Sequence, residues 1–212
     1  MKKRKIMIAV LLLIVIIGGL GGGYYYIQES KYISTDDAKI DGDLRAIGSL
    51  AAGTLIQWNA QEGDSFRKGD VLGVVQTSAN STLDIIAPDD GTIVSTNAVK
   101  DQTVSPGAAL AMTVDLNKLY VTANIQETDL NNVRVGNKVS ISVDAFPGIV
   151  FTGRVDTIGL ATNSELSLLP ASNSSSNYTK IIQRVPVKIV LDNYQDERLI
   201  PGLNATVKIS KS

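Results

Sequence analysis

An internal repeat with a spacing of 38 residues limits the possible folds of this chain more than any other feature. Gly53-Thr54-Leu55-Ile56 matches Gly91-Thr92-Ile93-Val94, and Asn59-Ala60 matches Asn97-Ala98. Each copy runs from a Val/Ile/Thr-rich strand through a turn to a second strand, with glycines where a turn needs positive φ. One copy cannot bury both of its faces. We therefore expect the two copies to stack as a small β-sandwich with an aliphatic interior.

The rest of the chain from Tyr32 onward also has the pattern of an all-β protein. Short runs rich in Val, Ile and Thr alternate with Gly, Asp, Asn and Pro turns, and only Gln126 to Asn132 favours a short helix. After the repeat, the pattern predicts a second β-domain. Its candidate strands are Leu119 to Ile125, Lys138 to Val143, Val150 to Ile158, Arg184 to Leu191 and Ala205 to Ile209.

Composition excludes several classes of function. The chain contains no cysteine and no histidine, which removes disulfides, Cys-His or Ser-His-Asp catalysis and the usual zinc sites. Of its 20 basic residues four lie in the segment 2–5, and no acidic residue precedes Glu29. The folded part is therefore acidic, whereas a nucleic-acid-binding protein concentrates positive charge there.

The N-terminus has the features of a membrane anchor. Residues 6–26 contain no charged side chain, and as a helix they would span about 31 Å, close to the hydrocarbon thickness of a bilayer. The basic residues 2–5 predict a cytoplasmic N-terminus and an exported remainder. A cleaved signal peptide is the alternative, but Gly18 to Gly23 followed by three tyrosines offers no A-x-A-like cleavage site. Both interpretations export the rest of the chain.

The repeat resembles a biotinyl/lipoyl-like, or barrel-sandwich hybrid, domain. Ala52 to Leu72 is similar to its first half, and Ile86 to Gly107 is similar to its second half. Biotinyl and lipoyl domains carry a modified lysine between the halves, and Gln76 to Asp84 contains none. A cofactor-carrier function is therefore not expected, and no cofactor is predicted.

The same fold occurs in the membrane fusion proteins, the periplasmic adaptors of efflux pumps and secretion systems. The resemblance to the EmrA-like branch of the HlyD family covers nearly all of residues 33–210. It rests on Thr35-Asp36-Asp37-Ala38, Lys118 to Asn124, Glu127 to Leu130, Ser167 to Ala171, Gln183 to Val187 and Pro201-Gly202-Leu203.

The resemblance implies an all-β chain with one N-terminal transmembrane helix, a barrel-sandwich hybrid domain and an adaptor β-barrel domain. It also implies an integral-membrane transporter as partner, of the major facilitator class first and an ATP-driven exporter second, and assembly as a homo-oligomer. The expected division is 1–5 cytoplasmic tail, 6–26 transmembrane helix, 27–45 connecting segment and first strand, 46–115 barrel-sandwich hybrid and 116–212 β-barrel.

Most adaptors of this family carry a long α-helical hairpin between the two lipoyl halves. Here Gln76 to Asp84 would reach out and back by only about 15 Å when fully extended, so no helical hairpin fits. We infer that this chain does not bridge to an outer-membrane channel in the usual way. A cell with a single membrane is the simplest explanation.

A long Ser/Asn-rich loop, Gly159 to Tyr178, is the candidate partner-contact site. Loops of more than about 12–15 residues are usually either functional or disordered. A mobile surface loop is therefore the first interpretation, and a loop that touches the transporter is the second. The apolar residues that would make the contact are Leu166, Leu168, Leu169 and Pro170.

No catalytic, cofactor-binding or metal-binding residue is predicted. Asp36-Asp37 are neighbours in a strand and point to opposite faces, while Asp89-Asp90-Gly91 reads as a turn. Trp58, the only tryptophan, is expected to be partly buried in the core. The sequence thus favours a non-enzymatic, membrane-anchored efflux adaptor. An anchored binding module without a transporter and an exported carboxylate enzyme remain open alternatives.

Overall fold

The computed structural model describes residues 31–79, 81–166, 182–194 and 198–211. These form two compact units. The barrel unit comprises the described parts of Met1–Lys39, Thr122–Asn193 and Asn204–Ser212, and the sandwich unit comprises those of Ile40–Val121 and Tyr194–Leu203. The predicted transmembrane segment 6–26 lies outside the described residues. None of the described helices has the length and apolar composition needed to cross a membrane.

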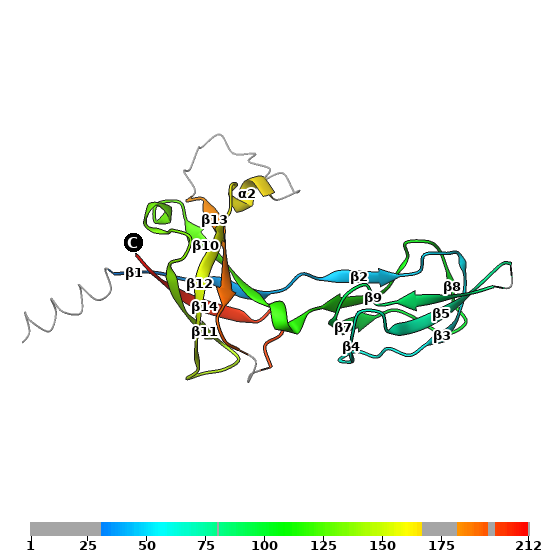
Figure 1. The fold of residues 1–212 in the computed structure, drawn as a ribbon. Helices are drawn as coiled ribbons and strands as arrows, with labels where there is room; N and C mark the ends of the chain where they lie inside the picture. The colour runs from blue at the N-terminus through cyan, green and yellow to red at the C-terminus, as the bar shows by residue number, and fades with distance from the viewer. Residues whose placement is uncertain (1–30, 80, 167–181, 195–197, 212) are drawn as a thin grey trace, which may run out of the picture. The chain divides into compact units, whose positions relative to one another are not determined.

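The barrel unit is a closed six-stranded barrel in the order β1-β10-β13-β12-β11-β14 (Figure 1). β1, the strand predicted in the segment 27–45, pairs antiparallel with β14, from Tyr32↔Ser210 onward. The strands are β1 (Tyr32–Asp41), β10 (Tyr120–Gln126), β11 (Lys138–Val143), β12 (Val150–Ile158), β13 (Arg184–Leu191) and β14 (Asn204–Ser210).

Alternating side chains explain why these segments close into a barrel. In β13, Val185, Val187, Ile189 and Leu191 are buried, and the residues between them are partly or fully exposed. A period of two places every second residue on one face of a strand. The inward faces together form an aliphatic core, so the predicted barrel strands are confirmed.

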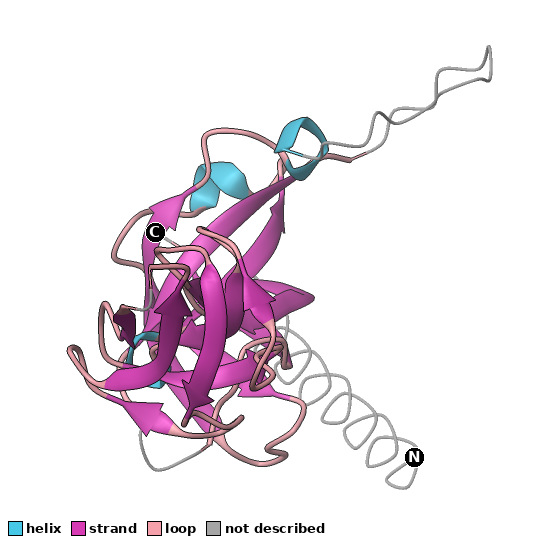
Figure 2. Cartoon of the chain, turned by 90° about the vertical axis from the view of Figure 1, so that its right-hand side faces the viewer, coloured by secondary structure: helices cyan, strands magenta, loops and turns pink. Residues whose placement is uncertain are grey.

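The sandwich unit is built from two four-stranded sheets, ordered β2-β9-β7-β4 and β6-β5-β3-β8. Strands make up most of both units, and the described helical segments are single short turns (Figure 2). The strands are β2 (Arg45–Gly48), β3 (Gly53–Trp58), β4 (Ser65–Phe66), β5 (Val71–Thr77), β6 (Thr82–Ile86), β7 (Gly91–Thr96), β8 (Thr103–Val104) and β9 (Ala109–Val114).

The two halves of the repeat exchange their shortest strands. β4 of the first half pairs with β7 of the second, with Phe66 opposite Gly91. β8 of the second half pairs with β3 of the first, with Val104 opposite Gly53. A shift of 38 residues converts one pairing into the other, so the halves fold onto each other as predicted and bury one shared core. That core includes Leu55, Phe66, Leu72, Val75, Ile85, Ile93, Val104 and Leu110, with Trp58 packed partly buried against it.

The connection between the halves is a tight β-hairpin. β5 and β6 pair directly, with Gln76 opposite Thr82, and the Thr77 N–H donates to Ser81 O at 2.8 Å. No helical arm rises between the two described strands. The predicted absence of the α-helical hairpin is confirmed.

The short helix predicted over Gln126 to Asn132 is only partly formed. The structure has a single 3-10 turn, η2 (Leu130–Asn132), and its N-cap residue Asp129 makes no side-chain capping hydrogen bond. Without a cap and with one turn of length, an α-helix here lacks the cooperativity it needs.

Candidate functional site

The predicted partner-contact loop can be followed only at its start. Leu166 is the last residue of α2 (Asn163–Leu166), whereas Leu168, Leu169 and Pro170 lie outside the described residues. Two hydrogen bonds tie α2 to β10 and to the residue that precedes β13. Asn163 Nδ2 donates to Asn124 Oδ1 at 2.8 Å, and Ser164 Oγ donates to the side chain of Gln183. The role of the loop in partner contact stays a prediction.

A polar cluster on the barrel unit centres on Asp37. Its Oδ1 accepts from Asn124 Nδ2 at 2.9 Å, and its Oδ2 forms an ion pair with Arg184. A register shift in β1 between Thr35 and Ala38 places Asp37 at an irregular point of the strand. The side chains of Asp37 and Arg184 are about two-fifths exposed, so their pairing contributes little stability. The cluster instead links β1, β10 and β13 close to where α2 is attached.

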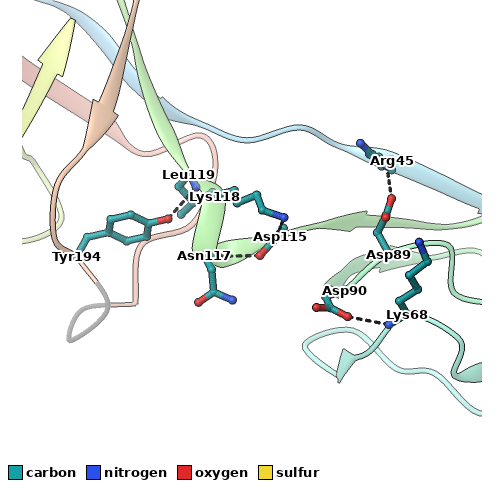
Figure 3. A network of polar contacts seen from close by, with 9 residues as sticks. All are labelled: Arg45, Lys68, Asp89, Asp90, Asp115, Asn117, Lys118, Leu119 and Tyr194. Atoms are coloured by element: carbon teal, nitrogen blue, oxygen red, sulfur yellow. Dashed lines mark hydrogen bonds and ion pairs between the residues drawn. The ribbon is translucent and has the colours of Figure 1, made fainter. Parts of the chain in front are cut away.

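A second polar network lies in the sandwich unit, where η1 (Leu116–Lys118) follows β9 (Figure 3). Asp115 caps this turn, because its Oδ1 accepts from the Asn117 N–H at 3.0 Å. Its Oδ2 lies 2.7 Å from Lys118 Nζ. One turn on, the N–H of the buried Leu119 donates to the Tyr194 hydroxyl oxygen at 2.8 Å. These contacts fix the path of the chain where it leaves the sheet.

The charges of this network shift the pKa values of its members. Burial alone would raise the pKa of Asp115, but hydrogen bonds from Lys118 and Asn117 outweigh it, and the pKa lies below its ordinary value. The same hydrogen bond to Asp115 raises the pKa of Lys118. Burial raises the pKa of Tyr194, and the hydrogen bond from Leu119 opposes this effect. Asp115 is therefore held as a carboxylate and Lys118 as an ammonium group.

The adjacent acidic turn is also fully engaged. Asp89 forms an ion pair with Arg45, and Asp90 Oδ1 accepts from the Lys68 N–H at 2.8 Å (Figure 3). A hollow in the surface here is lined by side chains of both charge signs, among them Asp43, Arg45 and Lys118. Within the described ranges, no group of three potential metal ligands is close enough to hold an ion. The arrangement holds chain segments together and offers no evident acid/base pair.

Sequence reasoning missed both polar clusters. Asp37 and Arg184 are far apart in the sequence, as are Leu119 and Tyr194, and no local spacing signals that these pairs meet. The hairpin connection was foreseen: Gln76 to Asp84 contains no lysine, so the position that carries a prosthetic group in biotinyl and lipoyl domains offers no attachment point.

Comparison with known proteins agrees with this geometry. Residues 43–115 match the family model described as YhbJ, barrel-sandwich hybrid domain. Residues 118–210 match the AAEA-like beta-barrel domain. The putative efflux system component YhbJ of Bacillus subtilis (strain 168) is 45% identical over 184 residues, which cover 87% of this chain and 82% of that protein.

Longer relatives match over a smaller share of their length. The probable multidrug resistance protein EmrK of Escherichia coli (strain K12) is 40% identical over 129 residues, covering 59% of this chain and 33% of EmrK. This chain thus spans about a third of the EmrK-type relative. Among solved structures, the periplasmic adaptor protein EmrA has a TM-score of 0.58 at 14% identity, covering 86% of this chain and 99% of that chain. At that identity the likeness concerns the fold alone.

Proposed function

Because the chain belongs to the HlyD/EmrA-like family of membrane fusion proteins, in a form without the α-helical hairpin, we propose that it is a membrane-anchored efflux adaptor. Residues 6–26 cross the cytoplasmic membrane, with the N-terminus in the cytoplasm and the folded units on the other side. The adaptor stands beside an integral-membrane transporter, of the major facilitator class first and an ATP-driven exporter second. It assembles as a homo-oligomer and catalyses no reaction.

The direct β5–β6 turn is the observation that carries this proposal. This turn stands where a cofactor carrier has its modified lysine and where a long adaptor has its helical arm. What remains is a rigid scaffold whose paired halves share one aliphatic core. Such a scaffold suits an organising role on the outer face of the cytoplasmic membrane, without a bridge to an outer-membrane channel. The names of YhbJ and EmrK, an efflux system component and a multidrug resistance protein, favour efflux over other export.

Within this proposal the domains keep the division expected from the sequence, with a barrel-sandwich hybrid over 46–115 and a β-barrel over 116–212. The Ser/Asn-rich loop with Leu166, Leu168, Leu169 and Pro170 contacts the transporter. Deleting 167–171 should then lower drug tolerance, whereas deleting 173–177 should lower it less, because the second deletion spares the apolar residues. Unchanged tolerance with both deletions would refute the loop's role.

Co-purification tests the adaptor function. The full-length chain, tagged at its C-terminus, is recovered from native membranes in mild detergent, and its companions are identified by mass spectrometry. The matched control fuses residues 1–30 to an unrelated soluble domain. We expect a polytopic membrane protein with the full chain and not with the control. Recovery of no such protein, or equal recovery with both, would instead favour an anchored binding module.

Topology has its own test, because the chain contains no cysteine. Val150 is 62% exposed on the barrel unit, so Val150→Cys should react with a membrane-impermeant maleimide in intact cells. Lys3→Cys should react only after the membrane is permeabilised. Labelling of Lys3→Cys in intact cells would contradict the proposed orientation.

A further inference from the structure

The internal repeat gives the sandwich unit two ends with equivalent backbone structure. At the charged end, the loops Ala87–Asp90 and Arg67–Asp70 are joined by a hydrogen bond from the Gly69 N–H to Ala87 O at 2.9 Å. At the neutral end, the loops Ser49–Ala52 and Ser105–Ala108 are joined by the corresponding bond. Here the Gly107 N–H donates to Ser49 O, also at 2.9 Å. A shift of 38 residues therefore assigns every position at one end a counterpart at the other.

The two ends differ in charge at every position where the charged end has an ionic side chain. The charged end exposes five such residues, and all five have uncharged counterparts at the neutral end. Asp89 and Asp90 correspond to Ala51 and Ala52, and Arg67, Lys68 and Asp70 correspond to Ser105, Pro106 and Ala108. The same loop backbone thus bears charged side chains at the charged end and only uncharged side chains at the neutral end.

The neutral end also presents an exposed aliphatic side chain. Leu50, the counterpart of Pro88, is 85% exposed. The start of the β5–β6 turn borders this end, because Gly53 pairs with Thr77, and Thr77 to Ala79 adds no charge. The next loop holds Val99, 64% exposed, together with one residue of each sign, Lys100 and Asp101.

We propose that the neutral end is a contact surface for the neutral end of a second copy of this chain. The inference rests on the proposed function, because it names the surface through which adaptor copies associate. In such a contact a two-fold axis relates the two copies, and each copy contributes the same surface. Leu50 of each copy is removed from water, and no charged side chain of the two loops loses its hydration.

Charge explains why this end, rather than another face, suits a second copy. The segment Ile40–Val121 carries ten acidic and five basic side chains, so two sandwich units repel each other where their charges come within about 8 Å, the screening length at physiological salt. Contact through the charged end would also desolvate Asp89, Asp90 and their partners. At the neutral end both costs are smaller than at the charged end, because its two loops carry no charged side chain.

The surface is small, so the contact needs a high local concentration of the chain. Two four-residue loops fall well short of the roughly 800 Å² per partner that stable complexes bury. Copies held in one membrane have a much higher effective concentration than copies in dilute solution. We therefore expect the contact between membrane-anchored copies, and the test uses the full-length chain in native membranes.

Disulfide trapping tests the proposal with one matched control. Leu50→Cys introduces the only cysteine of the chain, and Pro88→Cys places one at the equivalent exposed position of the charged end. After oxidation with copper–phenanthroline, disulfide-linked dimers are measured on non-reducing gels. We expect at least about tenfold more dimer from Leu50→Cys than from Pro88→Cys.

A second variant separates specific contact from random collision. Ala51→Asp and Ala52→Asp, added to Leu50→Cys, copy the charged end's own residues onto a backbone that accepts them there. Four carboxylates facing each other should lower the dimer yield by about tenfold or more. Equal dimer from both cysteine positions, or a yield that the two aspartates leave unchanged, would overturn the proposal. Crosslinking of the Leu50→Cys variant mainly to a different protein by a bifunctional maleimide would also overturn it.

The same variants keep this inference separate from the adaptor function. Recovery of a polytopic membrane protein without neutral-end dimers would overturn the contact surface alone. Dimers without such a protein would support the contact surface and count against the adaptor function.

Discussion

Asp101 occupies the backbone position in the second half of the sandwich unit that Gly63 occupies in the first. Both have positive φ, 68° for Asp101 and 90° for Gly63. The Gly63 N–H donates to Ile93 O at 2.9 Å, and the Asp101 N–H donates to the repeat-equivalent Leu55 O at 2.7 Å. The turn therefore requires a left-handed residue in both halves, and only one half supplies glycine.

This relationship predicts opposite effects for two substitutions at Asp101. Asp101→Gly removes the steric cost of positive φ and should leave the free energy of unfolding unchanged or slightly higher. Asp101→Ala keeps the steric cost but loses the local hydrogen bonding that an Asp side chain can make. This substitution should lower the free energy of unfolding by about 1 kcal/mol. Urea unfolding followed by the fluorescence of Trp58, the only tryptophan, reports on this unit. Equal stabilities for the Gly and Ala variants would contradict the argument.

A second equivalent pair, Gly53 and Gly91, predicts unequal tolerance of a methyl group. A Cβ at Gly53 would lie 2.2 Å from the backbone Gln76 O, whereas a Cβ at Gly91 would lie 3.0 Å from the tip of the Phe66 ring and no closer than 3.3 Å to a backbone atom, Val114 O. The Phe66 ring can shift, but the strand that contains Gln76 cannot move without losing hydrogen bonds to its neighbouring strands. Gly53→Ala should lower the free energy of unfolding by about 2–3 kcal/mol, and Gly91→Ala by about 1 kcal/mol or less. The same fluorescence measurement decides, and the reverse order would refute this explanation.

The sequence predicted the parts of the fold that have a regular local pattern. Alternation located β13 from Val185, Val187, Ile189 and Leu191, and the match of Gly53 to Gly91 located the repeat. The structure extends the repeat to β2 and β6, where only the buried Ile47 and Ile85 match in sequence. One matching pair is too little to be recognised without coordinates.

Other features depend on contacts that no local pattern encodes. The exchange of β4 and β8 between halves involves strands of two residues, which have no measurable periodicity. The polar networks join residues far apart in the chain, such as Arg45 with Asp89. The difference in charge between the loops of the charged end and those of the neutral end is present in the sequence. It can be interpreted only when the hydrogen bonds show that these loops are structurally equivalent.

The hydrogen bond between Leu119 and Tyr194 predicts a cost for losing one hydroxyl. Leu119 is 3% exposed, so Tyr194→Phe leaves a buried N–H without its partner and should lower the free energy of unfolding by about 1–2 kcal/mol. Tyr120→Phe is the control, because the Tyr120 hydroxyl donates to the exposed Asp43 at 3.2 Å, a carboxylate that water can solvate. Chemical denaturation should show the larger loss for Tyr194→Phe, and equal losses would argue against a specific role for this bond.

The cap at Asp115 predicts a stability that depends on pH. Because the folded protein lowers the pKa of Asp115 below its ordinary value of 3.8, its contribution is present above that value and is lost as the pH falls through the folded pKa. Asp115→Asn keeps an oxygen that can accept from the Asn117 N–H but loses the charge that attracts Lys118. Its unfolding midpoint should therefore change less than that of the parent chain between pH 6 and pH 3. Asp115→Ala also loses the cap and should cost about 1 kcal/mol further at neutral pH. Parallel midpoints for the parent chain and Asp115→Asn across this range would show that the carboxylate's charge does not support the turn.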